Sequence, residues 1–558
     1  MTKMIHLIQN ELTKQLKKVS VIIMLCLLLA ASIALPVLKL ATDKISEDDS
    51  WSLQYIDESI QQMQQEKENP PKDFTDQQKK MLNEAVDIQV QYLNMQKEND
   101  IGYDDWRYDE LNQLIELHCT AFIQKQLIAG AADSDIIKAV SMVMPPDIAL
   151  EQNKGLSKEE LQKSYEENMK QVSSKYQAIL KNDYIGHLKN DVRPEAVQAV
   201  EALESGAQSS QEQEGSTVMN NGAIAQYGDQ GPSSKVELEQ AKMFLEIVDY
   251  RIEHNVMYDR SDWRHNTLLA MNNEVENANA TVMSKEDFEA TGNTLSYDAY
   301  KKMAQDSIQK AKDEITRCRY SLNNNIPIME HNGGSRYVLS IGLIFIMGIM
   351  VICIMVGGSI MSQEYSKGTI RLLMLRPVAR WKIILSKFIC VLLIGLGAMA
   401  ATGVVQTITS AFLFGFGDLL APVLMCSGGV VTEVPFFLWY LLAGLFAGIN
   451  VLFASCLAVA LSTIFKNTAF AVGLSIFITL SGFFVVMMGA NLGMYWLAYT
   501  FFPYFNLGTY VTGGEIQHMY QMLSFPTYPV YGACLLAALA VLLTVVTTII
   551  FQKRDVKN

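Results

Sequence analysis

The sequence predicts an all-α polytopic membrane protein with six transmembrane helices, an N-terminal interfacial helix and a large helical extracellular domain. Three observations favour this fold: six long apolar runs, an uneven division of charge along the chain, and apolar residues at helical spacing in the polar part. Half of the 558 residues are hydrophobic, but the mean hydropathy of +0.13 is too low for a chain lying wholly within a membrane. A soluble part must therefore accompany the membrane part.

Charge divides the chain into these two parts. Residues 42–335 carry 52 acidic and 29 basic side chains, a balance of −23. The rest of the chain carries 6 acidic and 16 basic side chains, a balance of +10. A large acidic domain is therefore inserted into a sparsely charged, basic membrane domain.

The first predicted element is an amphipathic helix within residues 1–18. Its apolar stripe recurs at helical spacing, with Lys and Gln on the other face, and consists of Met4, Ile5, Ile8, Leu12 and Leu16. Such a helix lies in the membrane interface with its lysines toward anionic lipid. A simple flank of a signal anchor is the alternative, but five apolar positions on one stripe exceed what a flank needs.

Six apolar runs follow, each with at least the roughly 20 residues that cross a hydrocarbon core of about 30 Å. They belong to two stretches of the chain, residues 19–41 and 336–558. The predicted spans are Val19–Leu38, Tyr337–Met361, Phe388–Phe416, Phe436–Phe465, Thr468–Ala490 and Val530–Phe551.

Lysine and arginine gather on one side of these spans. Basic residues occur in the N-terminal segment, in the loop at 362–387, at Lys466 and in the C-terminal tail, whereas the loops at 417–435 and 491–529 contain none. Because cytoplasmic loops are enriched in Lys and Arg, we expect both termini in the cytoplasm and residues 42–335 outside the cell.

A cleaved signal peptide is the alternative for the first span. Basic residues, an apolar stretch and Ser32-Ile33-Ala34 would fit cleavage after Ala34. The length of the run and the presence of Pro36 just beyond that point favour a retained helix.

The extracellular segment has the pattern of packed helices. Capping boxes begin helices at Thr75 and Ser157, and apolar stripes recur over residues 161–179 and 300–322. Another stripe has heptad-like 4-3-4-3 spacing and consists of Met81, Ala85, Ile88, Tyr92 and Met95. Several helices packed as bundles or hairpins are therefore expected.

Interruptions separate these helices. Residues 205–234, rich in Ser, Gln, Gly and Asn, are expected to form a flexible loop. Cys119 and Cys318 lie on predicted helices, and although the compartment permits a disulfide, the sequence leaves their pairing open. Helix breaks are expected at Pro70-Pro71, Pro145-Pro146, Pro194 and Asn323–Pro327.

Polar and aromatic residues mark two further features of the membrane domain. The loop at 491–529 is rich in Tyr, Phe and Trp, which fits either an interfacial belt or short helices that dip into the outer leaflet. Gln406, Asn450 and Asn491 lie in or near apolar runs and either line a pathway or bond to a neighbouring helix. Gly444-x-x-x-Gly448 and the small residues onward to Ala460 permit close helix approach.

No pattern typical of a catalytic or metal site occurs in the sequence. It contains no Gly-x-x-x-x-Gly-Lys-Ser/Thr, His-Glu-x-x-His, Gly-x-Ser-x-Gly or Cys-x-x-Cys pattern, and its seven histidines are scattered. We therefore expect neither an enzyme site nor a bound cofactor or metal in this chain.

The loop between the second and third spans carries the most informative pattern. It reads Glu364-Tyr365-Ser366-Lys367-Gly368-Thr369-Ile370-Arg371-Leu372-Leu373-Met374-Leu375-Arg376-Pro377-Val378-Ala379-Arg380. Gly368 and Thr369 allow a sharp bend, the leucines supply an apolar knob, and the arginines can pair with acidic groups or phospholipid. An ordinary basic cytoplasmic loop is the alternative.

The Glu-x-x-x-Gly-Thr-Ile-Arg pattern, followed by Arg-Pro and by Arg380 with Lys387 seven residues later, closely resembles the cytoplasmic segment of ABC-2 type ABC transporter permeases. The resemblance covers residues 336–558 well and 1–41 loosely, where Glu11 matches an acid of that family's elbow helix. It does not explain the large extracellular domain, since the simplest members have only a short loop there. It implies coupling to an ATPase through Glu364, Gly368, Thr369, Arg371, Leu372, Leu373, Arg376, Pro377 and Arg380, with Ile8, Glu11 and Leu12 in the elbow helix.

The function implied by this resemblance is that of a permease subunit that exports a peptide, antibiotic or lipid-like molecule. Its partners would be two copies of an ABC ATPase that binds ATP and Mg²⁺, a second permease chain, identical or paralogous, and membrane lipids, but no nucleic acid. Two alternatives remain: an ABC-driven mechanotransmitter, and a surface receptor or scaffold that acts through the extracellular domain without transport. The acidic balance of that domain either serves solubility or attracts a cationic peptide or partner.

Overall fold

The computed structural model describes residues 2–46, 50–102, 105–205, 234–290, 296–370, 372, 378–512, 519–520 and 525–553, and the chain forms two compact units. The membrane unit comprises Met1–Thr42 and Ala280–Asn558, and the inserted unit comprises Asp43–Asn279. Residues 280–335, which precede the second span, thus belong to the same unit as the spans.

Six helices of the membrane unit are long and apolar enough to cross a membrane, which confirms the predicted number of spans. The chain is therefore a multi-pass membrane protein. The third span begins at Arg380 rather than at Phe388; its polar first turns are compatible with a span because long basic side chains reach toward the bilayer surface. The spans are Val19–Thr42, Ser335–Ser366, Arg380–Phe414, Phe436–Phe465, Thr468–Ala490 and Pro529–Lys553.

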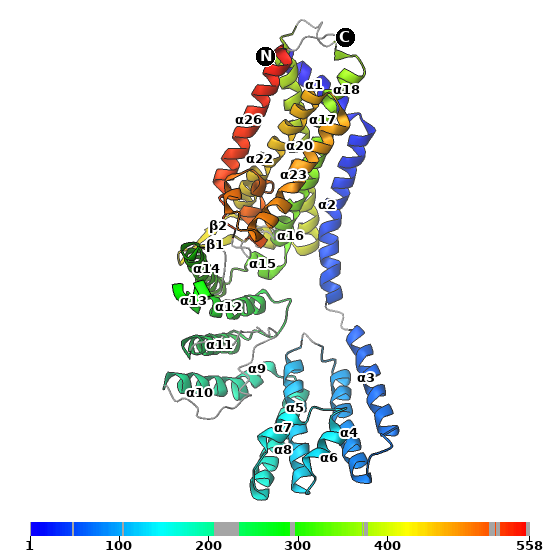
Figure 1. The fold of residues 1–558 in the computed structure, drawn as a ribbon, viewed down its shortest axis with the longest axis vertical. Helices are drawn as coiled ribbons and strands as arrows, with labels where there is room; N and C mark the ends of the chain where they lie inside the picture. The colour runs from blue at the N-terminus through cyan, green and yellow to red at the C-terminus, as the bar shows by residue number, and fades with distance from the viewer. Residues whose placement is uncertain are drawn as a thin grey trace. The chain divides into compact units, whose positions relative to one another are not determined.

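The helices of this unit form one bundle (Figure 1). The N-terminus with α1, the short helix α18 and the end of α26 lie at one end, and the strands β1 and β2 lie toward the other. The second span is divided into four helical pieces, α16 to α18 with the 3-10 turn η2 between them. The bounds are α1 Thr2–Leu16, α2 Val19–Ser46, α13 Lys285–Ala290, α14 Tyr297–Asn324, α15 Met329–Asn332, α16 Ser335–Ile341, η2 Gly342–Ile344, α17 Phe345–Ile360, α18 Ser362–Ser366, α20 Arg380–Phe414, α21 Gly417–Leu420, α22 Phe436–Phe465, α23 Thr468–Asn491, η3 Tyr495–Tyr499, η4 Phe502–Tyr504, α24 Thr509–Thr512 and α26 Pro529–Lys553.

Small residues bring α17 close to its neighbours at the centre of the bundle. A Cβ on Gly357 would lie 2.9 Å from the Cβ of Ala458, and one on Gly358 would lie 2.5 Å from Val472 Cγ2. The Ser462 hydroxyl donates to the Gly358 carbonyl at 2.7 Å. Close approach therefore occurs where the small-residue stretch nears Ala460, whereas a Cβ added to Gly444 would have no described atom of another helix within 4 Å.

A β-hairpin lies in the segment 417–435, for which the sequence predicts only a loop between two spans. β1 (Val423–Ser427) and β2 (Val430–Val434) pair antiparallel, with Ser427 opposite Val430. Gly428 and Gly429 both have positive φ, +60° and +80°, which suits a two-residue hairpin turn. The Asp313 carboxylate of α14 accepts from both glycine N–H groups, at 3.0 and 2.7 Å, so α14 holds the turn.

The aromatic loop after α23 contains the short helices η3, η4 and α24. The side chain of Asn450 in α22 donates to the Tyr504 carbonyl at 2.6 Å and accepts from the Leu507 N–H at 2.9 Å. Asn450 thus fixes this loop on α22. Gln406 is buried in α20 beside Gly342, and the side chain of Asn491 lies outside the described residues.

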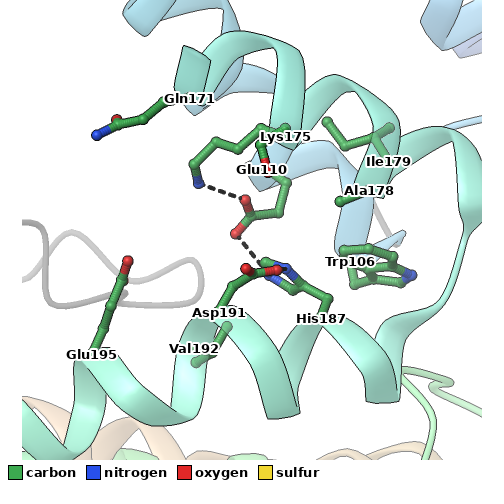
Figure 2. A pocket seen from close by; sticks show the side chains of 11 residues that line it. Trp106, Glu110, Gln171, Lys175, Ala178, Ile179, His187, Asp191, Val192 and Glu195 are labelled. Atoms are coloured by element: carbon green, nitrogen blue, oxygen red, sulfur yellow. Dashed lines mark hydrogen bonds and ion pairs between the residues drawn. The ribbon is translucent and has the colours of Figure 1, made fainter. Parts of the chain in front are cut away.

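All the regular secondary structure in the described part of the inserted unit is helical. A recess lies between α5, α8 and the segment α9–η1–α10 (Figure 2). The bounds are α3 Ser50–Glu68, α4 Asp76–Glu98, α5 Trp106–Ile128, α6 Asp133–Val140, α7 Asp147–Gln152, α8 Lys158–Lys181, α9 Tyr184–His187, η1 Leu188–Val192, α10 Arg193–Glu204, α11 Ser234–His254 and α12 Trp263–Asn279.

Local sequence signals of this unit agree with its structure at most positions. Thr75 and Ser157 form the predicted capping boxes with Gln78 and Glu160, and the heptad-like stripe of α4 is buried except at the partly exposed Ile88. The predicted break at Pro194 is wrong. The chain is helical from Tyr184 to Glu204 because a π-helical turn, η1, ends just before Pro194, which then occupies the first turn of α10.

Two other predictions concern single features. Cys119 of α5 and Cys318 of α14 are both buried, free thiols. Of the predicted flexible loop 205–234, residues 206–233 lie outside the described residues.

Candidate functional site

The N-terminal helix α1 packs against α20 in the membrane unit. Leu7 and Gln15 of α1 are buried, and Ile8, Glu11 and Leu12 are partly buried. Two members of the predicted apolar stripe, Ile5 and Leu16, are exposed instead, by 53% and 40%. The packed face is thus rotated from the predicted stripe, because it accommodates the polar side chains Glu11 and Gln15.

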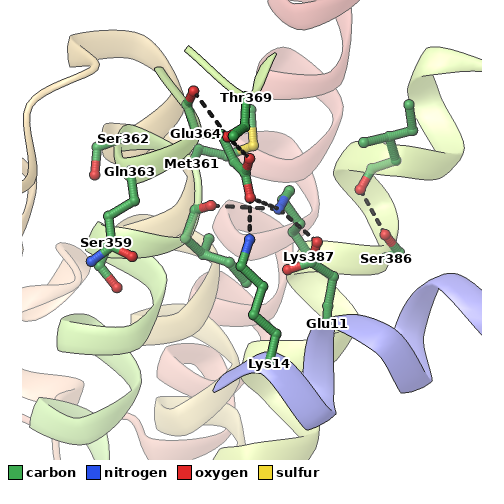
Figure 3. Close-up of polar contacts among 12 residues, drawn as sticks. Glu11, Lys14, Ser359, Met361, Ser362, Gln363, Glu364, Thr369, Ser386 and Lys387 are labelled. Atoms are coloured by element: carbon green, nitrogen blue, oxygen red, sulfur yellow. Dashed lines mark hydrogen bonds and ion pairs between the residues drawn. The ribbon is translucent and has the colours of Figure 1, made fainter. Parts of the chain in front are cut away.

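Glu364 of α18 lies at the centre of a polar network at this end of the bundle (Figure 3). Its carboxylate accepts from Lys14 Nζ of α1 and from the hydroxyl of Thr369. The Glu364 side chain is only 7% exposed, whereas that of Lys14 is 51% exposed. The lysine thus reaches from the surface to a nearly buried carboxylate.

Lys387 of α20 is a buried member of the same network. Its side chain is fully buried, and its Nζ lies 3.1 Å from Glu11 Oε1 and 3.9 Å from Glu364 Oε1. It also donates to the Ile360 carbonyl at 3.4 Å. A buried lysine ammonium requires such partners, because an isolated buried charge is very costly.

Charge in the network is nearly balanced. Glu11 and Glu364 face Lys14 and Lys387, and Lys18 donates to Gln363 Oε1 at 3.0 Å beside them. Burial, together with the like charges of Lys14, Lys367 and Lys387, lowers the pKa of Lys18. The network therefore links α1, α18 and α20 by charge rather than by apolar packing alone.

The structure brings together three of the residues singled out from the sequence, Glu11, Glu364 and Thr369. Gly368 has φ +69°, so it makes the predicted bend, and Leu372 is 68% exposed. Arg380 lies apart from the network and donates to the Gln552 carbonyl at 3.1 Å, near the end of α26.

Four of the predicted residues lie outside the described part of the chain: Arg371, Leu373, Arg376 and Pro377.

Sequence reasoning did not assign a role to Lys14 or Lys387. Lys14 looked like one of several basic residues of the N-terminal segment. Lys387 stood in the quoted pattern, and its position directly before a long apolar run was the signal that could have identified it. A lysine there is either exposed or held by a carboxylate, and only the packing of α1 on α20 decides which.

The network connects α18 to α1 through Lys14 and to α20 through Lys387. Within the described ranges, no three His, Cys, Asp or Glu side chains converge as metal ligands would.

Comparison with known proteins gives two matches. Residues 302–557 match a family model described as a protein of unknown function, DUF2705. The chain is also 30% identical over 250 residues to a Bacillus subtilis (strain 168) protein named "Uncharacterized protein YhcI", an alignment that covers 44% of this chain and 77% of the relative. No solved structure matches the chain. The family model thus spans most of α14 and the second to sixth spans, and the whole of the inserted unit lies outside it.

Proposed function

Because this chain belongs to the same family as the Bacillus subtilis protein YhcI, whose name states no activity, we propose its function from its own residues: it is the permease subunit of an ABC transporter of the ABC-2 type. It works as an exporter with two copies of a separate ATPase and with a second permease chain, identical or paralogous. ATP and Mg²⁺ bind to the ATPase.

In this proposal both termini, α1 and the region 362–387 are cytoplasmic, and residues 42–335 are extracellular. The distribution of Lys and Arg supports this orientation. The position of α1, α18 and the end of α26 at one end of the bundle agrees with it (Figure 1). The hairpin segment 417–435, which has no Lys or Arg, lies toward the other end.

The observation that carries the proposal is the contact of Glu364 with both Lys14 and Lys387. A permease that performs no bond chemistry must receive work from an ATPase and pass it to its spans. Glu364 lies in the last turn of the second span, Lys387 lies near the start of the third, and Lys14 lies in the helix before the first. A push on this region therefore reaches three spans at once.

Leu372 is the candidate point of contact for the ATPase. Its side chain is 68% exposed and follows the bend at Gly368. An apolar side chain projecting from a basic segment suits insertion into an apolar pocket of a partner whose rim is acidic.

Association with an ATPase tests the proposal first. Tagged full-length chain would be purified from its native membranes, and any co-purifying subunit would be identified by its own Gly-x-x-x-x-Gly-Lys-Ser/Thr sequence and by Mg-ATP hydrolysis. We expect Leu372→Asp to lose this subunit and Leu420→Asp to retain it. Leu420 is the matched control because it is an equally apolar and exposed side chain (81%) in α21, outside the region 362–387. Absence of an ATPase from every preparation, or equal retention by both variants, would contradict the proposal.

Coupling is tested with Glu364→Ala combined with Arg371→Ala. The double variant should keep the ATPase bound and hydrolysing ATP, but should lose ATP-driven export measured in inside-out vesicles. Normal export by this variant would refute the coupling role. A native complex that hydrolyses ATP while no substrate crosses the membrane would instead support the mechanotransmitter alternative.

A further inference from the structure

The recess of the inserted unit is bounded by α5, α8 and the continuous helical segment α9–η1–α10 (Figure 2). Its volume is about 240 Å³. This volume is smaller than the roughly 300–1,000 Å³ of sites for drug-sized ligands. A group of the size of one amino-acid side chain is what fits.

Buried charged groups form the floor of the recess. Glu110 of α5 accepts from Lys175 Nζ of α8 at 2.9 Å, and its other oxygen lies 3.3 Å from His187 Nε2 of α9. The second ring nitrogen of His187, Nδ1, lies 3.0 Å from Asp191. Glu110 and His187 are both nearly buried, with side chains 6% and 8% exposed. The floor is therefore a fixed chain of ion pairs that joins three helices.

An aromatic wall completes the floor. The Trp106 indole stacks on the His187 ring, with centroids 5.1 Å apart, and its N–H donates to Asn182 Oδ1 at 3.1 Å. Because the indole is held at both points, it offers a rigid apolar surface to whatever enters.

The π-helical turn η1 (Leu188–Val192) lies directly at the recess. Such turns are rare, and in proteins they are frequent at functional sites. Here the turn contributes Asp191 and Val192 to the lining and is followed within one turn by Glu195. The turn thus places Asp191 and Val192 at the recess.

Exposed charge at the recess is mainly negative. The two basic groups, Lys175 and His187, both face Glu110, while the Asp191 side chain is 54% exposed. Glu195 of α10 is exposed, and no described residue forms an ion pair with it. The inserted unit as a whole carries 44 acidic and 22 basic side chains, a balance of −22, so its field adds to the local attraction for cations.

We propose that this recess binds an ammonium or guanidinium group on a short aliphatic chain, such as the lysine or arginine side chain of a peptide. The carboxylates of Asp191 and Glu195 pair with the cation, and Trp106 covers the aliphatic part. Binding at the recess does not depend on transport. That the bound cation is the exported substrate rests on the proposed function above.

The test measures binding to full-length protein in lipid nanodiscs by calorimetry. The probe is a capped tripeptide with arginine between two glycines, and its reference is the same peptide with citrulline, which keeps the shape but has no charge. We expect the arginine peptide to bind at least about tenfold more tightly than the citrulline peptide, since two charge pairs, with Asp191 and with Glu195, of about threefold to fivefold each multiply to such a factor. Free arginine distinguishes a small organic cation from a peptide side chain. If free arginine binds as tightly as the arginine peptide, the recess is a site for small organic cations, and if it binds more weakly, the recess is a site for peptides.

A matched pair of variants distinguishes binding at the recess from attraction by the overall negative charge of the domain. Glu195→Gln should weaken binding of the arginine peptide by about threefold to fivefold. Glu201→Gln, an equal change of charge at an exposed position later in α10 that does not line the recess, should leave binding unchanged. Equal effects of the two variants, equal binding of the citrulline peptide, or no binding of any probe would overturn the proposal.

ATP-driven export without binding at the recess would overturn this proposal alone, and binding without an associated ATPase would overturn only the proposed function.

Discussion

The ammonium group of Lys387 lies 3.1 Å from the Glu11 carboxylate, so the buried start of the third span is tied to the N-terminal helix. The lysine side chain has no exposed surface, and that of Glu11 is 13% exposed. In such a site, removal of one partner leaves the other as a buried charge without compensation.

Lys387→Met should therefore destabilise the protein strongly, by about 3–5 kcal/mol, because Glu11 and Glu364 lose their shared cation. Thermal unfolding in detergent would measure this. Combining Lys387→Met with Glu11→Gln should restore part of the loss, since the second change removes the uncompensated charge. Lys382→Met, five residues earlier on the same helix and outside the network, is the control and should have little effect. Additive losses in the double variant would show that the two residues do not interact.

Gly358 is predicted to tolerate no larger residue. A Cβ there would lie 2.5 Å from Val472 Cγ2 and 3.3 Å from the Val472 nitrogen, so Gly358→Ala should cost about 1–3 kcal/mol through overpacking of α17 against α23. Gly397→Ala in α20 is the matched control, because no described atom outside its own helix lies within 4 Å of that position. Unfolding midpoints would compare the two, and equal midpoints would mean that α17 does not pack this closely.

Asp313 should control the order of the β-hairpin. Asp313→Ala removes the acceptor of the Gly428 and Gly429 N–H groups, which should cost about 1 kcal/mol and speed amide exchange of the hairpin about fivefold. Hydrogen exchange of residues 423–434 with mass spectrometry would measure this. Asp306→Ala, an exposed acid earlier in α14, is the control. Unchanged exchange in Asp313→Ala would show that the strands are held by their own pairing.

The pairing of Glu110 with His187 predicts a pH dependence in the inserted unit. Burial opposes both charged forms, but the hydrogen bonds and charges of the partners outweigh it, so the pKa of His187 is raised above 6.5 and that of Glu110 is lowered below 4.5. The groups that face His187 are Glu110 of α5 and Asp191 of η1, and Lys175 of α8 also pairs with Glu110. The contribution of His187 to the stability of the inserted unit is complete below pH 6.5 and is lost as pH rises through its raised pKa. The contribution of Glu110 to that stability is complete above pH 4.5 and is lost as pH falls through its lowered pKa.

Protection of the backbone amides of α5 and of α9–η1 against hydrogen exchange should therefore be greatest between about pH 4.5 and 6.5. Hydrogen exchange of the full-length protein at pH 5.5 and 8.0 would test this, with His187→Gln as the variant and exposed His254→Gln as the control. The loss of stability of the inserted unit caused by His187→Gln should be about 1–3 kcal/mol at pH 5.5 and smaller at pH 8.0. An equal loss at both values would mean that His187 is neutral throughout this range.

The spans and the helix starts were predictable because their signals are local. A run of about 20 apolar residues must be buried in lipid or protein wherever it lies, and a capping box such as that of Ser157 with Glu160 satisfies backbone N–H groups within one turn. The all-α character and the six spans follow from such signals.

The hairpin, the helix through Pro194 and the partners of Lys387 were decided only by the tertiary structure. Strands of five residues are marginal alone, and here Asp313 of α14 fixes their turn across a separation of 115 residues. Pro194 is accommodated because the preceding π-helical turn shifts the hydrogen bonds of the backbone. Glu11 and Glu364 meet at Lys387 because α1 packs on α20, and the energy of that contact depends on burial, which distance along the chain does not reveal.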